Sequence, residues 1–147
     1  MAAIEAVVFD YGRTLVTFEY PAAELAAVVE RFRPAIARAT GMPAPAAEEM
    51  MRRILLPLEE LVDSPAHEEV SYLDVFGAAW RRAGLALPDS LLYDILDAEQ
   101  LVWDAAACVD TAGLQVLSWL GANGFKRAVC SNAPFPPSMC AAGSWGA

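Results

Sequence analysis

The chain has 147 residues, a formal net charge of -9, 56% hydrophobic residues and ten scattered Lys and Arg residues. Its length suits one domain with at most a modest insertion, and its apolar content is ample for a core. The acidic balance argues against nucleic-acid binding, and the absence of a long apolar run argues against a membrane span.

The cysteines Cys108, Cys130 and Cys140 are odd in number and have no Cys-x-x-Cys spacing. This number and spacing of cysteines are typical of a protein in a reducing compartment and do not match a zinc-binding motif. The N-terminus has no basic segment before its apolar residues, so we expect no secretory signal and a cytoplasmic protein. Cys130 is interpreted as a small core residue, and the single histidine, His67, as a loop residue.

The first element is a strand over residues 4–10, which is interpreted as buried on both faces because its apolar residues do not alternate with polar ones. A tight turn follows it. Residues 21–40 have apolar side chains at helical spacing and predict a helix that Pro34 kinks or breaks. Gly41 marks the end of this helix.

Three more helices are predicted over residues 43–62, 71–85 and 88–107. Pro57 disturbs the first of them. Ser71 is the expected N-cap of the second, with Asp74 at the capping-box spacing.

The pattern then returns to an amphipathic helix over residues 111–124 and a short strand over 128–130. The order strand, helical insertion, helix, strand predicts one βαβ crossover of parallel strands with an α-helical domain inserted after the first strand. We expect an incomplete α/β core of residues 1–16 and 106–147, and a helical insertion of residues 17–105.

Polar residues follow both predicted strands. In parallel sheets, ligands bind beyond the carboxyl ends of the strands, where Asp10 and Ser131 are expected to be neighbours. Asp10 offers a nucleophile and a hard oxygen ligand, while Thr14, Ser131 and Asn132 offer hydroxyl and amide groups. Each residue alone is equally typical of a turn or a cap. Together they favour phosphoryl transfer to a carboxylate with Mg²⁺ present.

The segment VVFDYGRTLV resembles motif I of the haloacid dehalogenase-like hydrolase superfamily, whose general form is hhhDxDGTL, and RAVCSN resembles motif II. The resemblance extends over residues 4–136. It implies a Rossmann-like core with a helical cap, and hydrolysis of a small phosphorylated metabolite through an aspartyl-phosphate.

The resemblance also implies residue roles. Asp10 is the implied nucleophile and a Mg²⁺ ligand, and the backbone carbonyl of Gly12 is another ligand. Thr14 supports the loop. Ser131 binds the transferring phosphoryl group, and Asn132 assists it.

Three departures from the family pattern matter. Gly12 replaces the second Asp, the general acid/base, whose help is commonly worth about a hundredfold to ten-thousandfold in rate. Arg13 replaces a Gly and either adds positive charge beside the phosphate or points to solvent. The motif III Lys or Arg and the motif IV acidic ligands are missing, because Lys126 precedes motif II and no acidic residue follows Asp110. We therefore expect a truncated chain with weak or no activity.

Two alternatives stay open. One is a non-catalytic interaction module that forms a homodimer through an uncovered sheet edge, since a two-stranded sheet leaves strands unpaired. The other is a dehalogenase-type hydrolase, in which Asp10 attacks carbon and needs no Mg²⁺. Metal dependence separates the last reaction from phosphatase action.

Overall fold

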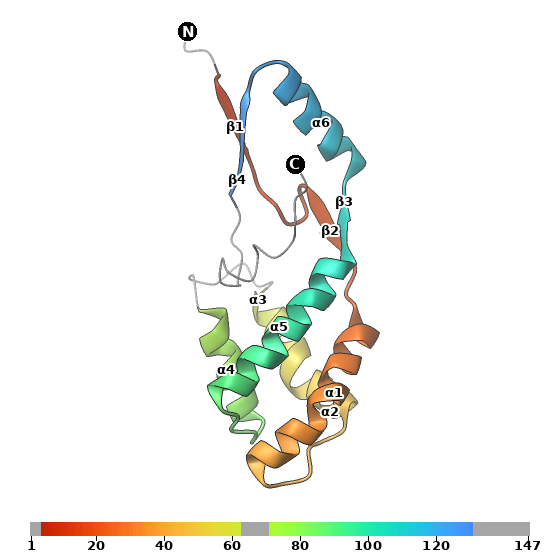
Figure 1. Cartoon of the computed structure of the whole chain (residues 1–147), viewed down its shortest axis with the longest axis vertical. Coiled ribbons are helices and arrows are strands. Elements are labelled where there is room, and N and C mark those ends of the chain that lie inside the picture. The colour runs from red at the N-terminus through yellow and green to blue at the C-terminus, as the bar shows by residue number, and fades with distance from the viewer. Residues whose placement is uncertain (1–3, 63–70, 131–147) are drawn as a thin grey trace. The chain divides into compact units, whose positions relative to one another are not determined.

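The computed structural model describes residues 4–62 and 71–130 (Figure 1). Within these ranges the chain is mixed α/β, mostly helical, and divides into two compact units. Residues 4–20 and 105–130 form an α/β unit, and residues 21–62 and 71–104 form a helical unit. The units thus divide after residues 20 and 104, a few residues from the boundaries expected after 16 and 105. No helix in the described ranges is long and apolar enough to cross a membrane.

The α/β unit has two small sheets and one helix. Strands β1 (Ala6–Phe9) and β4 (Lys126–Val129) are parallel, and Val8 lies opposite Ala128. Strands β2 (Val16–Phe18) and β3 (Ala107–Val109) are antiparallel. Helix α6 (Thr111–Ala122) connects β3 to β4. The parallel pair with an intervening helix agrees with the predicted crossover, whereas the β2–β3 ribbon was not predicted.

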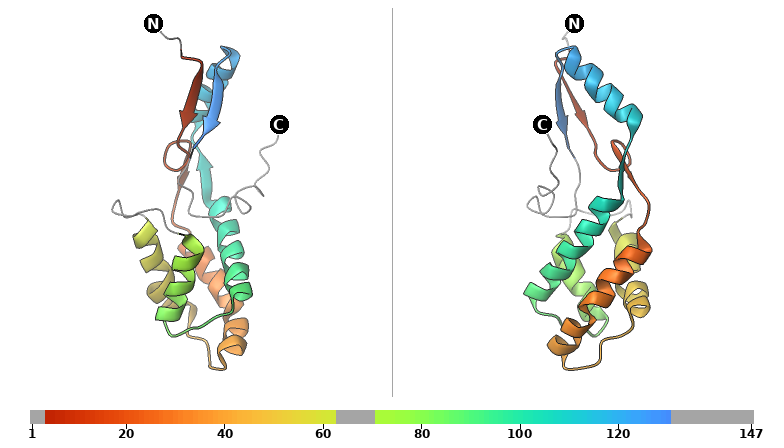
Figure 2. Two further views of the ribbon diagram at one scale, coloured as in Figure 1. Left: turned by 90° about the vertical axis from the view of Figure 1, so that its left-hand side faces the viewer. Right: turned by 45° about the vertical axis from the view of Figure 1, so that its right-hand side comes forward.

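One face of the β1–β4 sheet carries α6, as both views of Figure 2 indicate. Arg127 Nη1 of β4 donates a hydrogen bond to the carbonyl of Leu117 in α6, at 2.9 Å. Val7 lies opposite Arg127 and shares its face, so Val8 belongs to the opposite face, where its side chain is 62% exposed. The prediction that the first strand is buried on both faces is therefore wrong, because the only helix of this unit among the described residues covers one face. Cys130 is exposed, so its assignment to a core is also wrong.

Among the described residues, the helical unit contains six helical segments, and Figure 2 shows them gathered side by side. They are α1 (Ala22–Thr40), α2 (Ala47–Met50), the π-helix η1 (Met51–Leu55), α3 (Leu56–Val62), α4 (Tyr72–Arg82) and the main part of α5 (Asp89–Ala106). Helices α2, η1 and α3 follow one another without a break. Their largest fully buried side chains include Trp80, Phe76, Ile36 and Leu96. The buried core of the described chain lies mainly in this unit.

Several helix ends are where the sequence predicts them. Gly41 adopts the left-handed conformation at φ +69° and its N–H donates to Ala37, which ends α1. Ser71 caps α4 by accepting a hydrogen bond from the N–H of Asp74 at 3.4 Å. Helix α1 continues through Pro34, so a break, one of the two effects predicted for this proline, does not occur, while the predicted kink stays a prediction.

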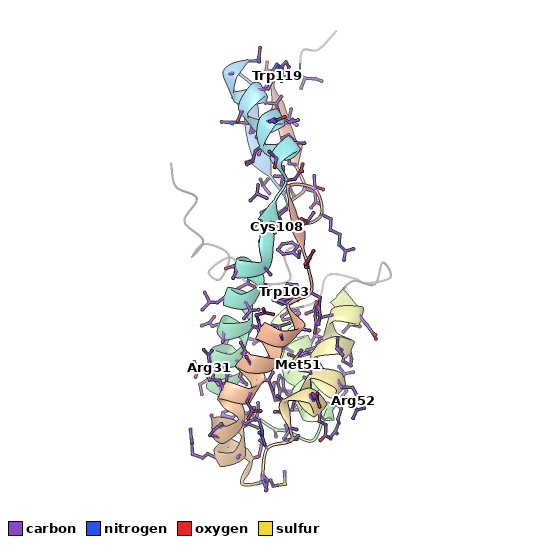
Figure 3. All side chains as sticks on the ribbon, turned by 90° about the vertical axis from the view of Figure 1, so that its right-hand side faces the viewer. Arg31, Met51, Arg52, Trp103, Cys108 and Trp119 are labelled. Atoms are coloured by element: carbon purple, nitrogen blue, oxygen red, sulfur yellow. The ribbon has the colours of Figure 1, made fainter. Side chains whose placement is uncertain are left out.

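The π-helix η1 lies directly before Pro57 (Figure 3 labels its first residues, Met51 and Arg52). A proline has no N–H to donate to the carbonyl four residues earlier, which here belongs to Arg53. The wider π-type turns let the N–H of Leu56 donate to Met51, five residues back, and the helix continues into α3. The disturbance predicted at Pro57 is thus a local change of helix type.

Candidate active site at the end of strand β1

Asp10 follows the last residue of β1 and is exposed. The neighbouring strand ends at the same level, because the N–H of Cys130 donates to the carbonyl of Phe9 at 2.8 Å. Ser131 and Asn132 follow Cys130 in the sequence but lie outside the described residues, so their contribution to this site stays a prediction.

In the turn after Asp10, one backbone carbonyl accepts hydrogen bonds from three backbone N–H groups. The carbonyl of Tyr11 accepts from the N–H groups of Thr14, Leu15 and Val16, at 3.3, 2.9 and 3.2 Å. This places Thr14 one turn beyond Asp10, and its Oγ1 donates to Asp10 Oδ2 at 3.0 Å. The described residues give Asp10 Oδ1 no hydrogen-bond partner. Among the described residues, one carboxylate oxygen accepts a hydrogen bond and the other accepts none.

Arg13 has φ +59°, the only positive value at a non-glycine residue in the described ranges. This left-handed conformation costs an ordinary side chain roughly 1–2 kcal/mol and suits glycine. It provides a physical reason for the Gly that the family pattern has at this position. The side chain of Arg13 is exposed, and this leaves both sequence-based interpretations of it open.

Gly12 does not have a positive φ, and a Cβ built on it meets no heavy atom within 4 Å. The backbone here therefore does not require glycine. A Cβ fits at position 12 without displacing a described neighbour.

The donor atoms that remain for a cation are few. The described residues contain no group of three or more His, Cys, Asp or Glu side chains that could hold a metal ion. They do offer the open Oδ1 of Asp10, and no described backbone N–H donates to the Gly12 carbonyl. Mg²⁺ is often bound by one or two carboxylates together with water and substrate phosphate oxygens. These two oxygens are of the donor type that Mg²⁺ takes, and they do not form a full site alone.

Leu15 and Val16, next to the turn, are buried, with 6% and 1% exposure. Val16 begins β2, which pairs with β3, and the N–H of Asp110 donates to the Leu15 carbonyl at 3.0 Å. The turn is thereby fastened to the start of α6. This support of the turn was not predicted from the sequence. The alternation of apolar and polar residues in LVTFE was the only signal of strand β2.

No family model matches the chain, and no curated protein or solved structure matches it either.

Proposed function

We propose that the α/β unit is part of a haloacid dehalogenase-like, Rossmann-like core, and that it acts as a phosphatase on a small phosphorylated metabolite. The observation that carries this proposal is the arrangement of Asp10. Its carboxylate stands at the carboxyl end of a parallel strand, with Oδ2 held by Thr14 and Oδ1 open. A nucleophile needs one free oxygen in a fixed orientation, and this arrangement provides it.

In the proposed reaction, Asp10 Oδ1 attacks phosphorus and the bond from phosphorus to the leaving oxygen breaks. The product is an aspartyl-phosphate, which water then hydrolyses to free the carboxylate and inorganic phosphate. The hydrogen bond from Thr14 orients the carboxylate during both steps. Mg²⁺, when bound by Asp10 and the Gly12 carbonyl, would offset the negative charge of the phosphoryl group.

The leaving oxygen must gain a proton unless it is stable as an anion. Gly12 has no side chain to supply that proton. Turnover is therefore expected to be weak for alkyl phosphates and measurable only for substrates with good leaving groups. In the proposal Ser131 and Asn132 hydrogen-bond the phosphoryl group, and Arg13 adds positive charge at the turn.

The test is hydrolysis of nitrophenyl phosphate by the purified chain with Mg²⁺, compared with Asp10→Asn. We expect slow, Mg²⁺-dependent release of nitrophenol that the substitution abolishes. Equal rates in both proteins would overturn the proposal. Release of halide from a haloalkanoic acid without Mg²⁺, also lost in Asp10→Asn, would instead support the dehalogenase alternative.

A second candidate function is self-association through the α/β unit. Its described residues bury few large side chains but expose many, and the exposed set consists of Ile4, Val8, Phe18, Tyr20, Val109, Leu114, Val116, Trp119 and Val129. Trp119, on α6, is labelled in Figure 3 and is 60% exposed. An apolar surface of this kind is typical of an interaction site.

The outer edge of β1 favours pairing with a second copy. Strand β4 carries Lys126 and Arg127, charges that discourage edge-to-edge pairing, whereas Ala6–Phe9 carry none. We expect a dimer by light scattering at micromolar concentration that Val8→Lys converts to a monomer. A wild-type chain that stays monomeric at all concentrations would contradict this second proposal.

A further inference from the structure

A cleft of about 350 Å³ opens within the helical unit. Most of the residues that line it are apolar, and they come from η1, α3, α4 and Ala83, which follows α4. Ile54, Leu58 and Ala79 are the buried part of the lining. This volume is near the lower end of the range found for small-molecule sites, roughly 300–1,000 Å³.

Two guanidinium groups also line the cleft, those of Arg53 and Arg82. Arg53 is fixed in place, because its Nη1 contacts Glu49 Oε1 at 2.9 Å and its Nη2 donates to the Ala83 carbonyl at 3.2 Å. Arg82 is exposed and makes no ion pair with any described residue. In a chain with 19 acidic and ten basic side chains, an Arg that pairs with no described acidic residue is a notable local excess of positive charge at this cleft.

The π-helix gives a second, independent reason to consider this cleft. Arg53 and Ile54 both belong to η1, so the unusual helix type lies in the cleft wall. Single π-turns are rare and occur frequently at functional sites. Here the wider turn accompanies the contact that fastens Arg53 to the C-terminal end of α4.

We infer that this cleft binds a small amphipathic carboxylate, with its apolar body on Ile54, Leu58 and Ala79 and its carboxylate on Arg82. Arg82 supplies the positive charge that the carboxylate requires, and Arg53 neutralises Glu49, which would otherwise repel it. The apolar lining requires an aliphatic or aromatic body. The inference does not depend on the chemistry at Asp10.

The test is calorimetric titration of the full chain with decanoate below its micelle concentration. Arg82→Gln is compared with Arg81→Gln, which removes the same charge from the preceding, exposed position outside the cleft. Decyltrimethylammonium provides the same tail with the opposite charge. We expect saturable decanoate binding that Arg82→Gln weakens about tenfold, while Arg81→Gln changes it less than twofold. The cationic ligand should bind at least tenfold more weakly than decanoate.

A second variant keeps the inference testable should Arg82→Gln fail to fold. Ala83→Leu places a larger side chain in the cleft at a residue whose φ of -76° suits leucine, and it should abolish binding. Three results would overturn the inference: no saturable binding of decanoate, equal loss in the Arg81 and Arg82 variants, or equal affinity for the cationic ligand. The last two would assign the binding to exposed apolar surface elsewhere.

Discussion

Glu99 is the one acidic side chain buried among the described residues, with 3% exposure on α5. Its Oε1 has no hydrogen-bond partner there. Burial, and second the nearby charge of Glu59, raise the pKa of Glu99 well above its ordinary value of 4.5. The folded chain therefore holds a proton at Glu99 that the unfolded chain releases above about pH 4.5.

The sign of the pH dependence follows from this difference. Where the folded state binds more protons than the unfolded state, the free energy of unfolding falls as pH rises. Stability that is present below pH 4.5 is thus lost as pH rises through the raised pKa of Glu99. Glu99→Gln keeps the shape of the side chain and removes its ionisation.

We expect Glu99→Gln to be more stable than the parent chain at pH 8 and similar to it below pH 4.5. A buried polar group without a partner costs roughly 1–3 kcal/mol and remains in both chains, whereas ionisation adds a cost only in the parent chain at high pH. A gain of about 1–2 kcal/mol corresponds to a rise of roughly 2–8 °C in the unfolding midpoint for a chain of this size.

Thermal unfolding followed by circular dichroism between pH 4 and 8 measures this effect. Glu60→Gln is the matched control, since it removes the same charge from an exposed position on α3. A Glu99→Gln variant that is no more stable than Glu60→Gln at pH 8 would refute the reasoning. So would a pH dependence that survives unchanged in Glu99→Gln.

Two further predictions concern backbone geometry and helix capping. Gly41→Ala and Gly12→Ala each place a Cβ in open space, but of these two glycines only Gly41 has a positive φ. Gly41→Ala should therefore lower the free energy of unfolding by about 1 kcal/mol, whereas Gly12→Ala should leave it unchanged. Equal urea midpoints for these two variants would show that φ does not decide the cost. Ser71→Ala should destabilise the helical unit by about 1 kcal/mol, because the N–H of Asp74 loses its acceptor. Ser71→Asp retains an acceptor and should therefore be nearly as stable as the parent chain. An Asp variant as unstable as the Ala variant would contradict the capping role.

Local signals in the sequence predict much of the fold. Gly41 and Ser71 act through their immediate neighbours, so the end of α1 and the start of α4 can be read from the sequence. The β2–β3 ribbon could not, because it pairs three-residue strands from distant parts of the chain: Thr17 donates to the carbonyl of Cys108, 91 positions away. The exposure of Val8 was also unpredictable, since an apolar run indicates burial on both faces only where both faces are covered.

At the candidate site, the position of Asp10 beyond a parallel strand follows from motif order. Its hydrogen bond with Thr14 depends on a turn whose geometry the sequence does not specify. The predicted roles of Ser131 and Asn132 stay predictions. The cleft with Arg82 was not predicted, because its walls come from separate helices of the helical unit.

The most direct test of the proposed function is to supply the missing acid. Gly12→Asp places its Cβ in open space and adds a carboxyl group at position 12. The rates of nitrophenyl phosphate and alkyl phosphate hydrolysis with Mg²⁺ are then compared with those of the parent chain. We predict a gain of at least a hundredfold for the alkyl phosphate and a smaller gain for nitrophenyl phosphate, because only the alkoxide leaving group needs a proton. Both activities should vanish when Asp10→Asn is added. A folded Gly12→Asp chain with no gain, or with a gain that persists without Asp10, would contradict the proposed reaction.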